Sequence, residues 1–211
     1  MDESSPATPI TEPPSAGPTR RPGGRSAQVR RRVLDAVTAL LVERGYDALT
    51  VDAVAERAGT HRTTVYRRWR DVGGLLADVL AEATGDDWRP PDTGSLDGDL
   101  TAINLQVHAA LTDDPPLTGA LIAASFRSPP AAEALRVFWA DRYDRCAVVV
   151  HRAVARGEAP AGTDARALLV AATAPVYHEL LLLRTGADAA LARRAARTAA
   201  LAAGVGAFVP V

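Results

Sequence analysis

The chain has one cysteine, Cys146, and no lysine. A single cysteine excludes a disulfide framework and a cysteine-based metal cluster. Aromatic residues make up only 5% of the sequence, whereas alanine and leucine are frequent and strand-favouring runs are scarce. For a chain of 211 residues, this composition predicts an all-α fold with an adequate apolar core. All 24 basic residues are arginine, which we attribute to coding bias.

Catalytic and cofactor motifs are missing as well. The four histidines have no HExxH-type or paired spacing, Cys146 has no evident base partner, and neither a GxGxxG stretch nor a P-loop occurs. We therefore expect no enzyme, no metal and no cofactor.

Signals for export or membrane insertion are also lacking. Residues 1–24 are polar, contain six prolines and have no apolar signal core. No uninterrupted apolar run reaches transmembrane length, because Tyr177, His178 and Glu179 interrupt the nearest one, Val170–Leu183. We expect a cytoplasmic protein with no membrane partner.

Composition and periodicity divide the chain into four parts. Residues 1–24 form a tail that we expect to be disordered, residues 25–84 a small helical unit, residues 85–98 a linker, and residues 99–211 a C-terminal helical bundle. Besides two short helices between Thr50 and Arg70, the predicted helices are Ser26–Arg44, Asp71–Ala83, Leu96–Leu111, Leu117–Phe126, Ala131–Arg156, Asp164–Arg184, bent at Pro175, and Asp188–Ala203.

The stretch Thr50–Arg70 has the pattern of a helix-turn-helix. Ala55 allows the two helices to approach closely, Gly59 makes the turn, and Val65 anchors the second helix on the first. Val65 and Trp69 form the buried stripe of that second helix, and its other faces carry arginine, threonine and tyrosine but no acid. Solvated faces normally mix charges, so we favour a DNA-contacting helix over an ordinary helical hairpin.

Charge is distributed unevenly along the chain. The formal net charge is only −1, yet residues 20–70 contain 12 arginines and five acids. Residues 1–19 carry a net charge of −3 and residues 71–211 one of −5. This asymmetry indicates a nucleic-acid-facing module joined to a mildly acidic one.

The segment Arg31–Glu82, which contains RRVLDAVTALLVERGYDALTVDAVAERAGTHRTTVYRRW and LLADVLAE, resembles the DNA-binding domain of the TetR family of transcriptional regulators. The family's G-Y/F-x-x-x-T motif occurs at residues 45–50. Arg70 and Val72 stand where such regulators usually have a proline and a lysine, and we expect Arg70 to supply the charge. The shorter segment APVYHELLLLRTG resembles part of the C-terminal domain of one TetR subfamily.

The resemblance implies a recognition helix in the major groove. Arg62, Thr63 and Arg67 would face the bases. Thr50, Thr64 and Tyr66 would touch the DNA backbone, and His61 would cap the helix or contact a phosphate. Arg20, Arg21 and Arg25, continuing to Arg30–Arg32, form a basic arm. Beside a helix-turn-helix this arm would follow phosphates or enter the minor groove; alternatively, its arginines are incidental. Arg57 and Arg68 are expected to be solvated or ion-paired. The DNA-binding residues expected are Arg25, Thr50, His61, Arg62, Thr63, Thr64, Tyr66 and Arg67.

For the C-terminal bundle the resemblance implies a largely apolar effector cavity. Its candidate lining residues are Asn104, His108, Phe126, Phe138, Trp139, Tyr143, Tyr177 and His178, although each alone could be ordinary core. The last two helices would meet a second copy of the chain. The expected dimer-interface residues are Leu169, Ala172, Val176, Leu180, Leu183, Ala199 and Ala203; the alternative is that both helices are internal core.

These features predict a homodimeric repressor that binds a palindromic double-stranded DNA operator and is released by a small-molecule effector, with Asp71–Ala83 transmitting the change. One alternative is a DNA-binding activator or architectural protein without a ligand pocket. The other is an enzyme or protein-docking helical module that does not bind DNA.

Overall fold

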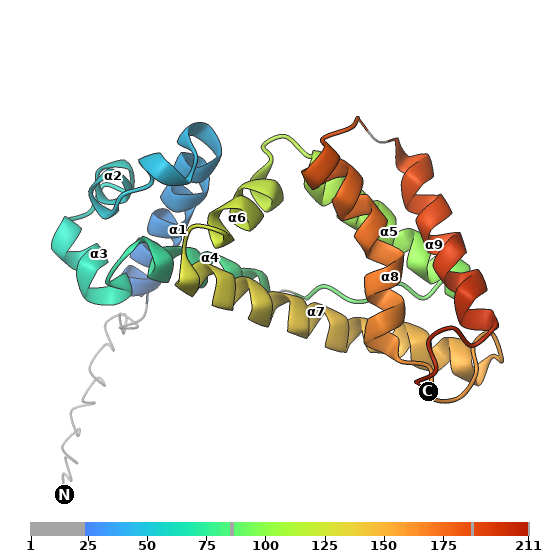
Figure 1. Cartoon of the computed structure of the whole chain (residues 1–211). Helices are drawn as coiled ribbons and strands as arrows, with labels where there is room; N and C mark the ends of the chain where they lie inside the picture. The colour runs from blue at the N-terminus through green and yellow to red at the C-terminus, as the bar shows by residue number, and fades with distance from the viewer. Residues whose placement is uncertain (1–23, 85–86, 187, 211) are drawn as a thin grey trace, which may run out of the picture.

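The computed structural model describes residues 24–84, 87–186 and 188–210. These ranges contain nine α-helices, a 3-10 turn (η1) and a π-helix (η2), and no β-strand, which confirms the all-α prediction (Figure 1). The elements are α1 (Gly24–Arg44), η1 (Tyr46–Ala48), α2 (Val51–Arg57), α3 (Arg62–Trp69), α4 (Val72–Thr84), α5 (Leu96–Thr112), α6 (Leu117–Ser125), α7 (Pro129–Ala155), α8 (Ala165–Tyr177), η2 (His178–Leu183) and α9 (Ala189–Gly204). The tail expected at residues 1–24 lies outside the described residues, apart from Gly24.

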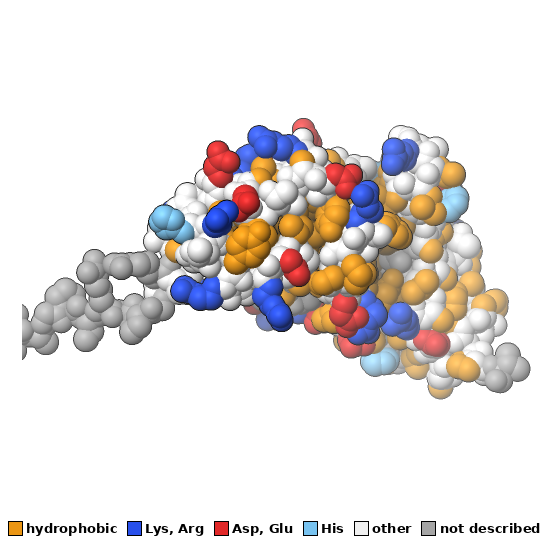
Figure 2. All heavy atoms as spheres, turned by 60° about the vertical axis from the view of Figure 1, so that its left-hand side comes forward, with side chains coloured by type: hydrophobic (Ala, Val, Ile, Leu, Met, Phe, Trp, Pro, Cys, Tyr) orange, Lys and Arg blue, Asp and Glu red, His pale blue; other side chains and the backbone are white. Residues whose placement is uncertain are grey.

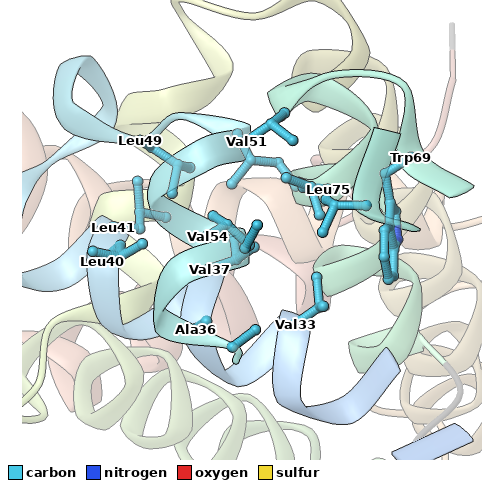
Figure 3. Close-up of a cluster of buried hydrophobic side chains, with 14 of the residues drawn as sticks. Val33, Ala36, Val37, Leu40, Leu41, Leu49, Val51, Val54, Trp69 and Leu75 are labelled. Carbon is cyan, nitrogen blue, oxygen red and sulfur yellow. The ribbon is translucent and has the colours of Figure 1, made fainter. Parts of the chain in front are cut away.

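The N-terminal helices close around one apolar cluster (Figure 3). Val33 and Val37 of α1, Val54 of α2, Val65 of α3 and Leu75 of α4 all have no exposed surface. Burying a side chain of this size stabilises the fold by about 1.5–3 kcal/mol, so these five positions account for much of the unit's cohesion.

The turn between α2 and α3 forms as the sequence predicts. Thr50 begins α2, because its Oγ1 accepts a hydrogen bond from the backbone N–H of Ala53 at 3.1 Å. After α2 the backbone of Gly59 has φ +58, a left-handed conformation that suits glycine. The N–H of Thr60 donates to the carbonyl of Ala55 at 3.0 Å and closes the turn.

The C-terminal helices α5, α7, α8 and α9 enclose a second apolar cluster that includes Leu100, Val149, Leu168 and Ala196. Asn104 of α5 is fully buried within this bundle. Its amide nitrogen donates to the Ala172 carbonyl at 2.8 Å and to the Ala192 carbonyl at 3.0 Å. One side chain thus joins α5, α8 and α9.

The segment predicted as a linker is fastened to the bundle over its described part. The N–H of Thr93 donates to the buried carboxylate of Asp99 at 2.6 Å, and Arg152 of α7 lies 3.5 Å from that carboxylate. Trp88 donates from Nε1 to Gln106 of α5 at 2.8 Å. Residues 87–95 therefore form a strap along α5 and α7, and α5 already begins at Leu96.

Two contacts join the N-terminal unit to the C-terminal bundle. Helix α4 packs on α7, where Gly73 comes so close to Pro130 that an added Cβ would lie 2.8 Å from its ring. Helix α6 packs on α1 and η1, and Arg127 beyond its end pairs with Asp47 of η1 at 2.7 Å. Both α4 and α6 therefore bridge the bundle and the N-terminal helices.

The helix predicted over Asp164–Arg184 changes type after Tyr177. Pro175 lies inside α8 and has no N–H to donate, so one α-helical hydrogen bond is lost there. The helix continues as the π-helix η2. The residue after η2, Arg184, has a left-handed conformation with φ +53. The expected bend at Pro175 is thus followed by a change of helical period, and segments of this kind are frequent at functional sites.

Candidate nucleic-acid interface and ligand cavity

Helix α3 leaves its arginine-bearing face uncovered. Arg62, Thr63 and Arg67 are exposed and Tyr66 is 48% exposed, whereas Val65 and Trp69 are buried against the N-terminal cluster. Neither Arg62 nor Arg67 pairs with an acid within the described part of the chain. Their guanidinium groups are therefore available for guanine edges or phosphates.

The remaining predicted DNA-contacting residues border this face. Thr50 is exposed at the start of α2, and Thr64 is half-buried on α3. His61 occupies the N-cap position of α3 but makes no capping hydrogen bond through its side chain. The capping role considered for His61 is thus absent from this structure, and the phosphate contact stays a prediction. Only the backbone of Arg25 is described, as part of α1; its side chain lies outside the described residues.

Arg57 and Arg68, which were expected to be solvated or ion-paired, are both exposed and engaged within the chain. Arg57 forms two hydrogen bonds with the Glu43 carboxylate, at 2.6 and 2.7 Å. Arg68 donates to Ser26 at 3.3 Å and lies over the Trp69 ring. Arg70 is exposed in a left-handed conformation, φ +67, between α3 and α4. Figure 2 shows arginine side chains distributed around the N-terminal unit, with hydrophobic side chains gathered over the C-terminal helices.

A cavity of about 1390 Å³ lies between the C-terminal helices and the end of α1. Its wall is contributed by α6, α7, α8 and η2, together with Leu41, Val42 and Gly45 from the end of α1 and the residue after it. A ligand in this cavity would touch both the bundle and the DNA-facing unit.

Five of the eight predicted ligand-binding residues line the cavity: Phe126, Trp139, Tyr143, Tyr177 and His178. The other three do not. Asn104 serves the core through its two carbonyl contacts, and His108 is half-buried on α5. Phe138 packs edge-on against Trp139, with ring centroids 5.2 Å apart, and so supports a wall residue without lining the cavity.

The two tyrosines of the cavity both have raised pKa values. Burial raises the pKa of Tyr143, and a hydrogen bond with Thr173 and the charge of Arg166 only partly offset it. Burial raises the pKa of Tyr177 further above its usual value, and the neighbouring Tyr143 adds to the effect. Both phenol groups are uncharged at neutral pH, as an unperturbed tyrosine is, and these shifts keep them so at higher pH.

Sequence reasoning missed the three arginines of the wall, Arg136, Arg166 and Arg184. Arg166 is the one on α8. It lies on the same face of α8 as Val170, Thr173 and Tyr177, which also line the cavity. The spacing of three and four residues along α8 could have revealed it, because Tyr177 was already a candidate.

The predicted dimer residues need a correction. Leu169, Ala172, Val176, Ala199 and Ala203 are all at most 4% exposed within one protomer. Side chains so deeply covered by their own chain cannot meet a second copy, and for these five the internal-core alternative holds. Of the other two, Leu183 is exposed, and Leu180 is half-buried and lines the cavity.

Helix α8 and η2 nevertheless leave much apolar surface uncovered. The stretch Ala165–Leu183 is long and apolar enough to cross a membrane by length and composition, with a mean hydropathy of 1.3, and 28% of it is buried. A single helix of this kind is weak evidence for a membrane span.

No group of three or more metal-ligating side chains occurs in the part of the chain that the structure describes.

An exposed, acid-free recognition helix on an all-α scaffold with an apolar cavity defines a helix-turn-helix DNA-binding regulator. The family model described as "Bacterial regulatory proteins, tetR family" matches residues 33–79, and "Tetracyclin repressor-like, C-terminal domain" matches residues 90–199. The chain belongs to the TetR family of transcriptional regulators, as its sequence predicts.

Known relatives cover most of the chain. The HTH-type transcriptional regulator AqdR of Rhodococcus erythropolis is 34% identical over 76% of this chain and 77% of its own length. A DNA-binding transcriptional repressor, TetR, of Mycobacteroides abscessus is 33% identical over 68% of this chain and 77% of its own. A crystal structure of the regulator FadR of Bacillus subtilis in complex with stearoyl-CoA shares the fold, with a TM-score of 0.63, 16% identity, and coverage of 81% and 97%.

Proposed function

We propose that this regulator is a homodimeric repressor, released from a palindromic operator when a small molecule enters its cavity. The observation that carries the proposal is the cavity wall, which combines the bundle helices with the end of α1. A ligand held there acts directly on the helix against which α2 and α4 pack.

The DNA contacts proposed are those of the exposed α3 face and its border. Arg62, Thr63 and Arg67 read the major groove, and Thr50, Thr64, Tyr66 and His61 contact the DNA backbone. Arg25 extends this set into the basic arm. Exposure and the lack of carboxylate partners among described residues support the assignment.

The proposed ligand contacts are the five predicted aromatic and histidine residues that line the cavity, joined by Arg166. The volume of about 1390 Å³ exceeds the roughly 300–1,000 Å³ typical of small-molecule sites. This space speaks against the alternative of a DNA-binding protein without a pocket. FadR of B. subtilis, solved with stearoyl-CoA, illustrates that the fold can hold a large ligand.

Two helices, α4 and α6, would transmit ligand binding to the DNA-binding unit and so release the operator. Helix α4 links the recognition helix to α7, and α6 rests on α1 and η1. The ligand would bind more tightly to an arrangement of the dimer in which the two recognition helices are wrongly spaced for the operator. This difference in ligand affinity between the two arrangements is then enough to displace the DNA. A coupling free energy of about 1–3 kcal/mol is typical and sufficient.

The proposed dimer surface is the uncovered face of α8, with α9 beside it. Ala167 and Ala171 are exposed along α8 and do not line the cavity, and Leu201 of α9 is 65% exposed. Small side chains let helices approach closely, and an apolar face of this kind is stabilised when a second copy covers it. The two-fold axis then relates two recognition helices and two operator half-sites.

The sign of regulation and the location complete the proposal. Repression is supported by the relative from M. abscessus that is named as a repressor. A regulator that acts on bacterial DNA works in the cytoplasm.

The experiment is selection of bound sequences from random double-stranded DNA, followed by gel-shift assays and sedimentation of the complex. We expect inverted repeats to be enriched and two protomers to bind each site. Enrichment of non-repeating sites by a monomer contradicts the dimeric mode, and a pool with no enriched sequence contradicts specific DNA recognition.

A further inference from the structure

We propose that the cavity binds an amphipathic carboxylate, with its large apolar body inside and its acidic group at Arg166. The inference rests on the proposed effector role of this cavity and names the chemical class of the effector.

The charges in the cavity wall all have one sign. Arg136, Arg166 and Arg184 line the cavity with His178, whereas no aspartate or glutamate contributes to the wall. Arg136 is neutralised by Glu133 at 2.5 Å. A cationic ligand would therefore meet only like charges, while an anion finds complementary ones.

Arg166 is the arginine best placed to receive the acidic group. It makes no ion pair with any residue in the described ranges, and its guanidinium carbon lies 5.3 Å from the ring centroid of Tyr143. The aromatic ring limits the positions of the guanidinium group. Such a group can donate two parallel hydrogen bonds to a carboxylate.

Neutral hydroxyl donors accompany this cation. The phenol of Tyr143 is uncharged at neutral pH, and burial raises its pKa further. Tyr177 lies on the same side of α8 and is also protonated. A cation together with uncharged phenol donors suits a carboxylate, because no negative group in the wall competes for it.

The rest of the wall fits an apolar body. It includes Leu111, Ile122, Phe126, Leu135 and Leu181. Trp139 stands edge-on to Tyr177, with centroids 5.5 Å apart, and offers an aromatic surface beside the polar group. The volume of about 1390 Å³ leaves room for a body larger than a single ring.

Three probes with the same body test the charge preference: 1-pyrenebutyrate, 1-pyrenebutanol and 1-pyrenebutylamine. Binding to the full-length protein is followed by calorimetry and by energy transfer from tryptophan to pyrene. We expect the acid to bind at least about tenfold more tightly than the alcohol, and the amine most weakly. The variant Arg166→Gln should reduce the affinity for the acid about tenfold and leave that for the alcohol unchanged.

The matched control is Arg193→Gln, since Arg193 is also an exposed arginine but does not line the cavity. It should leave all three affinities unchanged. Equal or tighter binding of the amine, loss of alcohol binding in Arg166→Gln, or no binding of any probe would each overturn the carboxylate inference. Gel shifts on the selected operator are run in parallel. If the protein binds the operator but the three probes do not rank as acid, alcohol and amine in affinity, only the carboxylate inference is rejected. If the protein does not bind any operator, the proposed function is rejected.

Discussion

The indole nitrogen of Trp69, at the end of the recognition helix, donates a hydrogen bond to a carboxylate oxygen of Asp78 on α4 at 2.8 Å. The same carboxylate accepts two hydrogen bonds from Arg30 of α1, at 2.9 and 3.0 Å. Three helices are thus held at one acidic group.

Replacing Asp78 with asparagine tests this junction. Burial by itself raises the pKa of Asp78, but the hydrogen bonds from Arg30 and Trp69 outweigh burial and the pKa is lowered. We expect Asp78→Asn to reduce the free energy of unfolding by about 1 kcal/mol at pH 7, because the pair is partly solvent-screened. The measurement is urea denaturation monitored by circular dichroism.

The pH dependence follows from the direction of that shift. A depressed pKa stabilises the fold above the unfolded-state value near 4, and this contribution is lost as the pH falls through the folded-state value. The stability difference between wild type and Asp78→Asn should therefore narrow below about pH 4. Glu82→Gln is the control, because its contact with Arg30 is exposed and longer, at 3.3 Å. A difference that stays constant with pH contradicts the assignment.

The free and the paired arginines of the N-terminal unit should behave differently in DNA binding. Arg62→Ala removes a cation without a carboxylate partner among described residues, and we expect operator affinity to fall by about 1–3 kcal/mol per contact. Arg57→Ala should change it little, because Glu43 already binds that guanidinium at 2.6 and 2.7 Å. Gel shifts at several salt concentrations measure both; equal losses in the two variants would remove the distinction.

Association of two protomers can be probed on the uncovered face of α8. Ala171 is exposed there and does not line the cavity. Arginine at this position would place a charge in the proposed contact, so Ala171→Arg should sediment as a monomer and lose operator affinity. Ala132→Arg, on an exposed position of α7, serves as the control and should remain dimeric. A dimeric Ala171→Arg would place the interface elsewhere.

Two glycines, Gly74 and Gly119, differ in whether the fold has room for an added methyl group. At Gly74 a Cβ would lie 2.1 Å from the carbonyl oxygen of Trp69, whereas at Gly119 the nearest atom is 3.7 Å away, on Leu181. Gly74→Ala must shift the corner between α3 and α4, and we expect a loss of about 1–3 kcal/mol. Gly119→Ala should be neutral or stabilise α6 by up to about 1 kcal/mol. Thermal unfolding measures both, and equal effects would contradict the close approach at Gly74.

The single cysteine should be unreactive in the folded protein. Cys146 is 5% exposed, and burial raises the pKa of its thiol to about 11, while Arg142 opposes this only weakly. At pH 8 about one thiol in a thousand is then ionised. We expect slow modification by an aromatic disulfide reagent in the native state and fast modification in urea. Rapid labelling of the native protein would show that the α7 core opens.

Most helices could be predicted from local pattern. The predicted starts of the helices beginning at Leu96 and Leu117 match the structure, and the helix-turn-helix follows from Ala55, Gly59 and Val65. Capping residues and apolar spacing act within a few residues of chain, so they can be read without knowing what packs against them. The family assignment depended on the same local features.

The cavity was harder to predict than the helices. Phe126, Trp139 and Tyr177 were identified by type, but Asn104 was mistaken for a ligand residue because its carbonyl partners lie on α8 and α9. Arg166 was missed because its position in the cavity wall depends on how α7 and α8 pack. The strap at residues 87–95 looked like a linker for the same reason, since Asp99 and Arg152 meet it only in the folded chain.

By itself, the sequence determined that this chain is all-α, that it carries a recognition helix without acids, and that it belongs to the TetR family. These properties depend on backbone preference, helical periodicity and charge, which are local. Only the tertiary structure decided which faces of α8 are covered. It buried Leu169 and Ala172 inside the protomer and left Ala171 exposed, because neighbouring positions on a helix point about 100° apart and only the packed neighbours select the inner side.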